Sequence, residues 1–372
     1  LCGKAEPRCC LFMNTHSLFF AIGRPVAPVY SAAMHLREYM YRQGVLSSYT
    51  FTVPVISVGN LTLGGTGKTP MVQYIARLLQ REGYRPAVVS RGYGGKARGR
   101  VNIVSDGAQQ LLDAVMAGDE PRFLAETLPG VPVLTGVVRR LAVQQAQAMG
   151  VDVVILDDGF QHLQVVRDIN LVLFNADRLA GNSRVFPGGE LREPVAALHR
   201  ATHFILTGIN ERNLDRAQQF SLLLGKKFPN ISVLQAGYIA GGLVRAAGGA
   251  LDESVADAMP HLAAFAFCGI AHPASFQRTL QEQGIQLAGF RPLADHQDYS
   301  ERLIGALLAE AKRAAADCLI TTEKDLVKLA PVAHRLPLPL YGLRMQVRAD
   351  VSFDQEILSF IERKRAGQAK CE

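Results

Sequence analysis

The chain has 372 residues, of which 48% are hydrophobic and 20% are charged. This composition excludes a disordered chain, and the length allows two domains of ordinary size. The formal net charge is +7 with histidines counted as neutral, which favours an anionic partner such as a nucleotide or an acidic lipid. Because the basic residues are spread out without a recognition motif, we expect no nucleic-acid partner. The six cysteines lack zinc-type spacing, which indicates reduced thiols in a cytosolic protein.

The first segment, residues 1–45, is interpreted as an N-terminal extension followed by a membrane-docking helix. The chain begins with Leu1 and offers Met13 as another start, so residues 1–12 can be an upstream extension. The helix expected over 26–46 interleaves aromatic and apolar side chains with arginines, a composition that suits the surface of a membrane. A helix packed on the protein's own core is the equal alternative. Prolines interrupt the apolar run before it, so we expect no transmembrane span.

The stretch from Val53 to Pro70 predicts a buried strand, a glycine-rich loop and the start of a helix. Glycines let backbone N–H groups close around an anion, because they reach backbone angles that other residues avoid. Lys68 adds a positive charge for the outer phosphates, and Thr69 offers a hydroxyl group to Mg²⁺. The usual first glycine of such a P-loop is replaced by Thr62. The predicted nucleotide-binding residues are Thr62, Gly64, Gly65, Thr66, Gly67, Lys68 and Thr69.

Two later apolar runs end in polar residues that are expected at the same sheet edge. Residues 86–90 predict a strand followed by Arg91, a candidate phosphate contact whose alternative is a solvated basic loop. Residues 151–158 predict a strand that ends in two carboxylates, the arrangement that holds Mg²⁺ in P-loop enzymes. The metal ligands predicted beside Thr69 are Asp157 and Asp158, and Gln161 and His162 follow on the loop that faces this edge.

Phosphoryl transfer also needs a base for the acceptor's proton. Asp119 and His272 are the candidates, and a carboxylate beside a histidine can act as a proton relay. The alternative for His272 is a helix-capping role before the proline that follows it. Glu120 adjoins Asp119 at an expected helix start, and the spacing does not separate a base from a Mg²⁺ ligand. The long loop 181–194 adds Arg184 and Arg192 as candidate contacts for an anionic substrate.

The alternation of strands and helices predicts an α/β protein with a doubly wound, mainly parallel sheet of the P-loop NTPase type. We place the P-loop domain at residues 46–222 and a second, smaller α/β domain at 223–372, with glycine-rich turns expected from 237 to 249. Residues 322–325 hold the letters of a guanine-reading motif in the wrong order, so ATP is favoured over GTP.

Eight motifs follow one another along the chain: Val58–Pro70, Ser90–Gly95, Gly118–Pro121, Asp157–His162, Leu191–Pro194, Gly269–Pro273, Asp295–Tyr299 and Thr322–Asp325. Together and in this order they closely resemble those of the tetraacyldisaccharide 4′-kinases of lipid A synthesis. The resemblance implies a kinase that uses ATP and Mg²⁺ at the cytosolic face of a Gram-negative inner membrane. It would phosphorylate the 4′-hydroxyl group of a tetraacylated glucosamine disaccharide 1-phosphate, and no obligate protein partner is inferred. The family's N-terminal helix helps it to dock on the membrane.

The resemblance also implies roles for single residues. Asp119 would accept the hydroxyl proton with His272 as its partner from the second domain. ATP and Mg²⁺ would be bound through Lys68 and Thr69. Supporting residues would be Glu120, Asp157 and Asp158, with Arg91, His162 and one of Arg139 or Arg140 as further contacts. Two other interpretations stay open at this point: a P-loop ligase with a soluble acceptor, resembling dethiobiotin synthase, and a membrane-associated ATPase that acts as a switch.

Overall fold

The computed structural model describes residues 20–247, 250–252, 262–270, 272–295, 297–349 and 351–368, so the expected extension over residues 1–12 lies outside the described residues. The strands up to β7 are β1 (Val55–Asn60), β2 (Pro86–Ser90), β3 (Asn102–Ser105), β4 (Val133–Thr135), β5 (Val153–Asp157), β6 (Ile169–Asn175) and β7 (His203–Thr207). The later strands are β8 (Ser232–Ala247), β9 (Ala250–Asp252), β10 (Ala263–Cys268), β11 (Gln286–Pro292), β12 (Cys318–Thr322) and β13 (Leu340–Ala349).

The helices alternate with these strands. Those up to residue 230 are α2 (Ala27–Arg42), α3 (Lys68–Arg81), α4 (Ala114–Ala117), α5 (Asp119–Thr127), α6 (Arg139–Ala148), the short 3-10 helix η1 (Val195–Arg200) and α7 (Leu214–Lys227). The later ones are α8 (Pro273–Glu282), α9 (Glu301–Arg313), α10 (Glu323–Ala333) and α11 (Val351–Gln368).

All the strands belong to one sheet, in the order β11-β10-β12-β13-β8-β7-β6-β1-β5-β2-β4-β3, with β9 paired to β8. The pairs are parallel except for β3 with β4, and β8 with both β9 and β13. β1 lies between β5 and β6, and all six of its residues are buried because helices cover both faces of the sheet. The mainly parallel sheet expected from the sequence is therefore present.

The helix α3 is held against the sheet by its apolar stripe. Met71, Val72, Ile75 and Leu79 are fully buried and belong to the same core cluster as Ile56 of β1. The spacing of these residues is that of one helix face, so burying them fixes the rotation of α3. The first turn of α3, which carries Lys68 and Thr69, is thereby presented at the carboxyl edge of β1.

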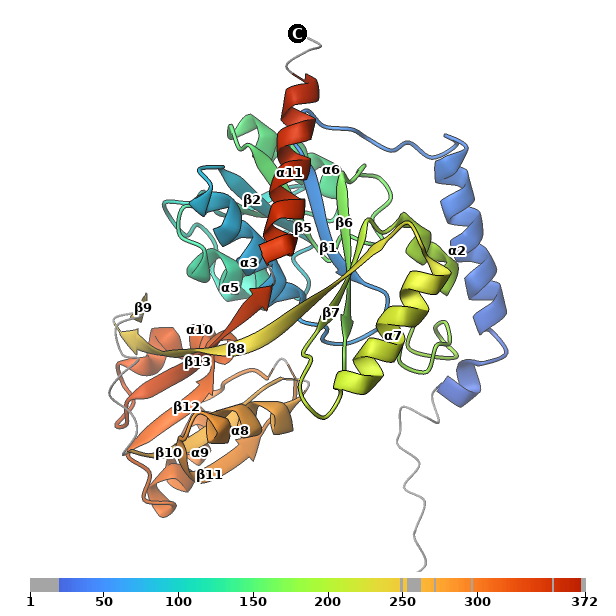
Figure 1. Ribbon diagram of the computed structural model, residues 1–372. Helices are drawn as coiled ribbons and strands as arrows, with labels where there is room; N and C mark the ends of the chain where they lie inside the picture. Colours follow the sequence, from blue (N-terminus) through green and yellow to red (C-terminus); the bar gives the residue numbers. More distant parts are fainter. Residues whose placement is uncertain are drawn as a thin grey trace, which may run out of the picture.

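The expectation of glycine-rich turns is wrong for residues 237–247, because residues 232–247 form the single long strand β8. Residues 248 and 249 of that expectation lie outside the described residues. Residues 232–236 pair in parallel with β7, and residues 236–245 pair antiparallel with β13. Glycines at 237 and 241 suggested turns, but backbone pairing on the sheet outweighs the weak local preference of glycine. Figure 1 shows β8 crossing from the upper part of the molecule to the lower part.

The C-terminal helix α11 returns to the first half of the chain. Its Phe353, Ile357 and Ile361 are buried in the core cluster that also contains Ile56 and Ile75. The division into domains at residues 222 and 223 stays a prediction. The packing favours a division within β8, with α11 added to the P-loop part.

The helix α2 lies along one side of the molecule (Figure 1). None of its residues is fully buried, and it is anchored through a few half-buried side chains, among them Tyr30 and Arg37. Within the described residues, no helix has both the length and the apolar character needed to cross a bilayer.

Candidate active site

The phosphate-binding loop, defined here as residues 61–67, joins β1 to α3. Gly64 has φ of 104° and Gly67 has φ of 81°, which L side chains rarely adopt. Gly67 is the N-cap of α3, so the free N–H groups of the first helical turn point toward the loop. Thr62 and Thr66 are buried, whereas Gly64 and Gly65 are exposed at the rim. Such a loop suits an anion, because several N–H groups and the positive end of the helix converge there.

Side chains from three strands hold the loop in this shape. Asn60 Nδ2 donates to Thr62 O at 2.8 Å, and Thr207 Oγ1 at the end of β7 donates to Thr66 O at 3.0 Å. The hydroxyl group of Tyr238, on β8, donates to Gly67 O at 3.2 Å. The sequence analysis missed these residues. A polar residue at the end of a buried apolar strand was a usable signal for Asn60 and Thr207, but Tyr238 lies in the segment that was expected to form turns.

Lys68 lies at the centre of a short chain of charges. Its Nζ atom is 3.1 Å from Asn60 Oδ1 and 3.4 Å from Asp158 Oδ1. On its other oxygen, Asp158 accepts from Arg192 Nη1 at 2.7 Å. Burial alone would raise the pKa of Asp158, but Lys68 and Arg192 outweigh it and hold the pKa below its ordinary value. Asp158 is therefore ionised at neutral pH, between two cations.

Asp157 behaves in the opposite way although it is the adjacent residue. Its carboxylate is buried at the end of β5, where Oδ2 accepts from Ser90 Oγ at 3.3 Å. Burial, followed by the charges of Glu120 and Asp158, raises the pKa of Asp157 to about 7, against the opposing effect of Lys68. The charges of Glu120 and Asp158 thus disfavour the ionised form of Asp157, an effect that a bound cation would relieve.

Arg139 is the member of the pair 139–140 that faces the carboxylates. Its Nη2 atom donates to Asp157 O at 3.0 Å and lies 3.4 Å from Asp158 O. Burial lowers the pKa of Arg139, and the two aspartates oppose this shift. Arg140 instead lies over the ring of Tyr49, 4.7 Å from its centroid.

Gln161 and His162 lie on the loop after β5, as expected. Gln161 Nε2 donates to Asn60 O at 2.9 Å. The backbone carbonyl of Gln161 accepts from Arg37 Nη2 at 3.0 Å, and this hydrogen bond links the loop to α2. Burial, followed by the nearby charges of Arg139 and others, lowers the pKa of His162 to about 4, so the ring is neutral at pH 7. Arg91 follows β2 as expected and is exposed.

Asp119 and Glu120 occupy the first turn of α5, after Gly118 with φ of 94°. Both contact lysines of α10, from the second half of the chain. Lys328 Nζ lies 2.6 Å from Asp119 Oδ2, and Lys324 Nζ lies 3.4 Å from Glu120 Oε1. The site is thus built from both halves of the molecule.

His272 does not meet Asp119 in this structure. It is exposed at the N-cap of α8, and its side chain makes no capping hydrogen bond. Among the contacts between described residues, none joins it to Asp119, so the pairing stays a prediction. The turn that precedes it is tied to α10, because Asp325 Oδ2 accepts from Gly269 N at 2.9 Å.

The motif 322–325 organises the start of α10. Thr322 caps the helix by accepting from Asp325 N at 3.1 Å, and buried Glu323 pairs with Arg344 of β13, whose Nε donates at 2.8 Å. Lys324 reaches Glu120, as described above. The sequence analysis used this motif to exclude GTP and as part of the family resemblance, and it missed the position of the motif between the two halves of the site.

Comparisons with known proteins show the family to which the chain belongs. Residues 19–362 match the family described as Tetraacyldisaccharide-1-P 4'-kinase. The tetraacyldisaccharide 4′-kinase of Desulfotalea psychrophila is 46% identical over 347 residues, which cover 93% of this chain and 98% of the relative. The kinase of the same name from Syntrophus aciditrophicus is 40% identical over 360 residues, which cover 95% of this chain and 93% of the relative.

A solved structure shows the same fold. LpxK of Aquifex aeolicus, crystallised in complex with ATP, matches with a TM-score of 0.72 and 28% identity, covering 91% of this chain and 97% of that one. The fold class and the family expected from the motifs are thereby confirmed, and the soluble ligase and the ATPase switch are set aside. The chain belongs to the family of tetraacyldisaccharide 4′-kinases, which act in lipid A biosynthesis.

Proposed function

We propose that this chain transfers the γ-phosphate of ATP to the 4′-hydroxyl group of a tetraacylated disaccharide 1-phosphate through the residues described above. The observation that carries the proposal is the convergence of Lys68, Asp157 and Asp158 on one sheet edge. The charge of Glu120 in the first turn of α5 reaches Asp157, and Asp119 is the residue next to Glu120 in that turn. In the reaction the hydroxyl oxygen bonds to the γ-phosphorus while the bond from that phosphorus to the β,γ-bridging oxygen breaks. ADP leaves, and the hydroxyl proton passes to a base of the protein.

The phosphate-binding loop and Lys68 would bind the triphosphate. Lys68 is only 15% exposed, and its present partners are Asn60 and the ionised Asp158. Lys68 and Arg192 share the single negative charge of Asp158, so the ammonium group of Lys68 is only partly neutralised. A phosphate oxygen bound beside Lys68 would supply the remaining negative charge. Arg192 is then available to keep Asp158 oriented.

The residues present fit a Mg²⁺ ion that is bound jointly by the protein and by the phosphates of the nucleotide. The described residues contain no group of three or more His, Cys, Asp or Glu side chains that would hold a metal alone, and Mg²⁺ bound to phosphates needs only one or two protein carboxylates. Asp158 Oδ1 is buried and accepts no hydrogen bond. Burial and the negative charges of Glu120 and Asp158 raise the pKa of Asp157, a shift that a cation would counteract. The residues that would hold the ion are Thr69, Asp157 and Asp158. When bound, Mg²⁺ would neutralise charge on the β- and γ-phosphate oxygens.

We assign Asp119 the role of the base that takes the hydroxyl proton. It lies at the N-terminus of α5, next to Glu120, whose charge reaches Asp157. For His272 to assist it, the turn after β10 must approach α5, since His272 is now exposed. Such a closure would assemble the base only when substrate is present and would limit hydrolysis of ATP by water.

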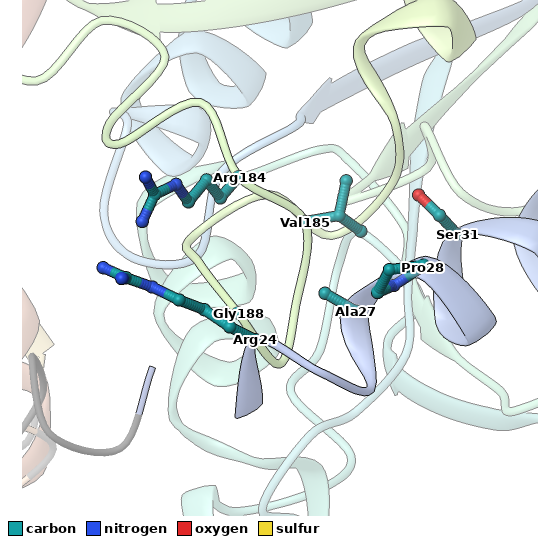
Figure 2. Close-up of a pocket in the computed structure, with 7 residues that line it drawn as sticks. All are labelled: Arg24, Ala27, Pro28, Ser31, Arg184, Val185 and Gly188. Carbon is teal, nitrogen blue, oxygen red and sulfur yellow. The ribbon is translucent and has the colours of Figure 1, made fainter. Parts of the chain in front are cut away.

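We propose that α2 and the loop 181–194 face the cytoplasmic surface of the inner membrane as a peripheral contact. Large apolar side chains on and before α2 are exposed, with Ile22 at 72% and Val29 at 69%. A pocket of about 350 Å³ is lined by residues near the start of α2 and by residues of the loop, namely Arg24, Ala27, Pro28, Ser31, Arg184, Val185 and Gly188. In Figure 2 the side chains of Arg24 and Arg184 extend to the same side of this pocket, beside an apolar wall. This combination suits lipid phosphates above acyl chains.

The test is direct. The protein is incubated with γ-labelled ATP, Mg²⁺ and the acylated disaccharide 1-phosphate in mixed micelles, and the organic phase is analysed. We expect label in the lipid and a strong loss of it in Asp119→Asn. Release of labelled inorganic phosphate at the same rate with and without the lipid, and none in the organic phase, would refute the proposal.

A further inference from the structure

The loop 181–194 contacts α2 on one side. The hydroxyl group of Tyr30, on α2, donates to the backbone carbonyl of Arg192 at 3.0 Å. The ring of Tyr30 packs edge-on against Phe186, with 5.7 Å between the ring centroids. Tyr30 is half-buried, and burial raises its pKa above the ordinary value, so the hydroxyl group stays protonated and can donate at neutral pH.

The same loop contacts the phosphate-binding loop on its other side. Arg192 N donates to Leu61 O at 2.8 Å, and Leu63 N donates to Glu190 O at 2.7 Å, with a bridge between Thr62 and Leu191. Residues 190–192 therefore run as a short antiparallel partner of residues 61–63. Both residue 61 and residue 63 are fixed in place by backbone hydrogen bonds to this segment.

The side chain of Arg192 extends the connection to the charged groups. Its Nη1 atom lies 2.7 Å from Asp158 Oδ2, and Asp158 Oδ1 lies 3.4 Å from Lys68 Nζ. One residue thus contacts three parts of the site: its carbonyl is held by Tyr30, its N–H holds residue 61, and its guanidinium group orients Asp158. The hydrogen bond from Tyr30 of α2 is made to the backbone of Arg192. It would therefore persist if the side chain of Arg192 rotated.

We propose that Tyr30 is a positioning residue for ATP binding, which acts through Arg192 and makes the docking helix α2 and the nucleotide site one mechanical unit. The identification of α2 as the docking helix rests on the proposed function, whereas the link from Tyr30 to Arg192 and the phosphate-binding loop does not. A displacement of α2 at the membrane surface would be transmitted to Leu61 and to the orientation of Asp158 beside Lys68. The lipid surface would therefore influence the affinity for nucleotide.

The test compares Tyr30→Phe with Tyr39→Phe. The first variant removes only the hydroxyl group and keeps the ring against Phe186, and the second removes a hydroxyl group from the same helix at a side chain that is 58% exposed. Binding of labelled ATP with Mg²⁺ is measured by equilibrium dialysis without lipid, and KM for ATP is measured with lipid. We expect Tyr30→Phe to weaken ATP binding and to raise KM for ATP by about three- to tenfold, the usual effect of one lost hydrogen bond. We expect Tyr39→Phe to match the parent chain.

A double-mutant cycle with Arg192→Ala then separates positioning from loss of stability. If Tyr30 acts through Arg192, the fold-change from Tyr30→Phe shrinks in the Arg192→Ala background, because only the backbone link to Leu61 remains and the guanidinium group no longer transmits the shift to Asp158. An undiminished fold-change in that background would show that the guanidinium group has no part in the effect and would overturn the proposed link to Asp158. Equal ATP affinity of Tyr30→Phe and the parent chain would overturn the proposal. So would a loss of vesicle binding without a change in ATP affinity. A failure of lipid phosphorylation in every variant would contradict the proposed function but would leave the ATP-binding comparison intact.

Discussion

The ammonium group of Lys328 lies 2.6 Å from Oδ2 of Asp119, so a helix from the second half of the chain holds the proposed base of the first half. Lys328 also donates to Gln297 O at 3.1 Å and is only 9% exposed. Two contacts therefore define the position of the nearly buried Lys328 ammonium group. Such an ammonium group orients the Asp119 carboxylate better than the mobile partner of a surface ion pair would.

Lys328→Met is expected to lower kcat by about tenfold or more with a smaller effect on KM for ATP, because it leaves the Asp119 carboxylate without its nearly buried ionic contact. Lys328→Arg should recover part of the loss. Lys324→Met is the matched control, since Lys324 lies 3.4 Å from Glu120, a side chain that is 42% exposed. Steady-state kinetics with mixed micelles measure both constants. A larger effect from Lys324→Met than from Lys328→Met would contradict this interpretation.

Asp119→Asn is expected to reduce turnover by about 10²- to 10⁴-fold while the affinity for ATP changes little, because a general base acts in the transition state. The amide keeps the shape of the side chain but does not accept the hydroxyl proton. Single-turnover transfer of γ-phosphate to lipid measures the chemical step, and dialysis measures ATP binding. Near-normal turnover together with a large loss of ATP affinity would remove Asp119 from the base role.

Gly67→Ala is expected to abolish most ATP binding. Its φ of 81° strains any residue with a Cβ by about 1–2 kcal/mol, and that Cβ would lie 1.4 Å from the hydroxyl oxygen of Tyr238. Adding Tyr238→Phe should restore part of the binding, because it removes the clashing atom but not the backbone strain. Gly83→Ala, after the end of α3, is the control for backbone strain, since Gly83 has φ of 80° and a Cβ there meets nothing within 4 Å. Equal losses from Gly83→Ala and Gly67→Ala would show that contact with Tyr238 is irrelevant.

His162 is expected to make the protein less stable in mild acid. Its pKa is about 4 in the folded chain and 6.5 as the ordinary value, so the unfolded chain binds the extra proton first. The folded state therefore loses stability as the pH falls from about 6.5 toward 4 and gains none above 6.5. We expect urea unfolding at pH 7 and pH 5 to show a smaller loss of stability for His162→Gln than for the parent chain. Equal losses would mean that the ring is already protonated in the folded state.

Reversal of the charges at the pocket between α2 and the loop 181–194 should weaken membrane binding. We expect the variant with Arg24→Glu and Arg184→Glu to sediment less with vesicles that contain acidic phospholipid, because about 1 kcal/mol of attraction is lost for each arginine near such a surface. Binding of ATP should be unchanged. Arg302→Glu with Arg313→Glu, both exposed on α9, is the control that changes the net charge by the same amount. Unaltered sedimentation of the double variant, or an equal loss in the control, would count against docking by this face.

The chemistry of the site could be predicted largely from local sequence. Strand, glycine loop and helix follow one another within residues 53–81, and the next acidic strand end at Asp157 is equally local. Parallel strands bring their carboxyl ends to one edge, so these motifs had to meet once the sheet was predicted. The loop from Ser90 to Gly95 followed from the same reasoning, whereas the helix start at Asp119 followed from the two adjacent carboxylates at that turn.

Contacts between distant segments were decided only by the tertiary structure. Tyr238 reaches Gly67 because β8 is one long strand, and its glycines had indicated turns. Lys328 reaches Asp119 because α10 packs near α5, and Tyr30 reaches Arg192 because the loop 181–194 lies between α2 and the phosphate-binding loop. Periodicity and turn preferences report the conformation of neighbouring residues only. The burial of many apolar side chains together decides which distant surfaces meet. No single motif in the sequence determines that total.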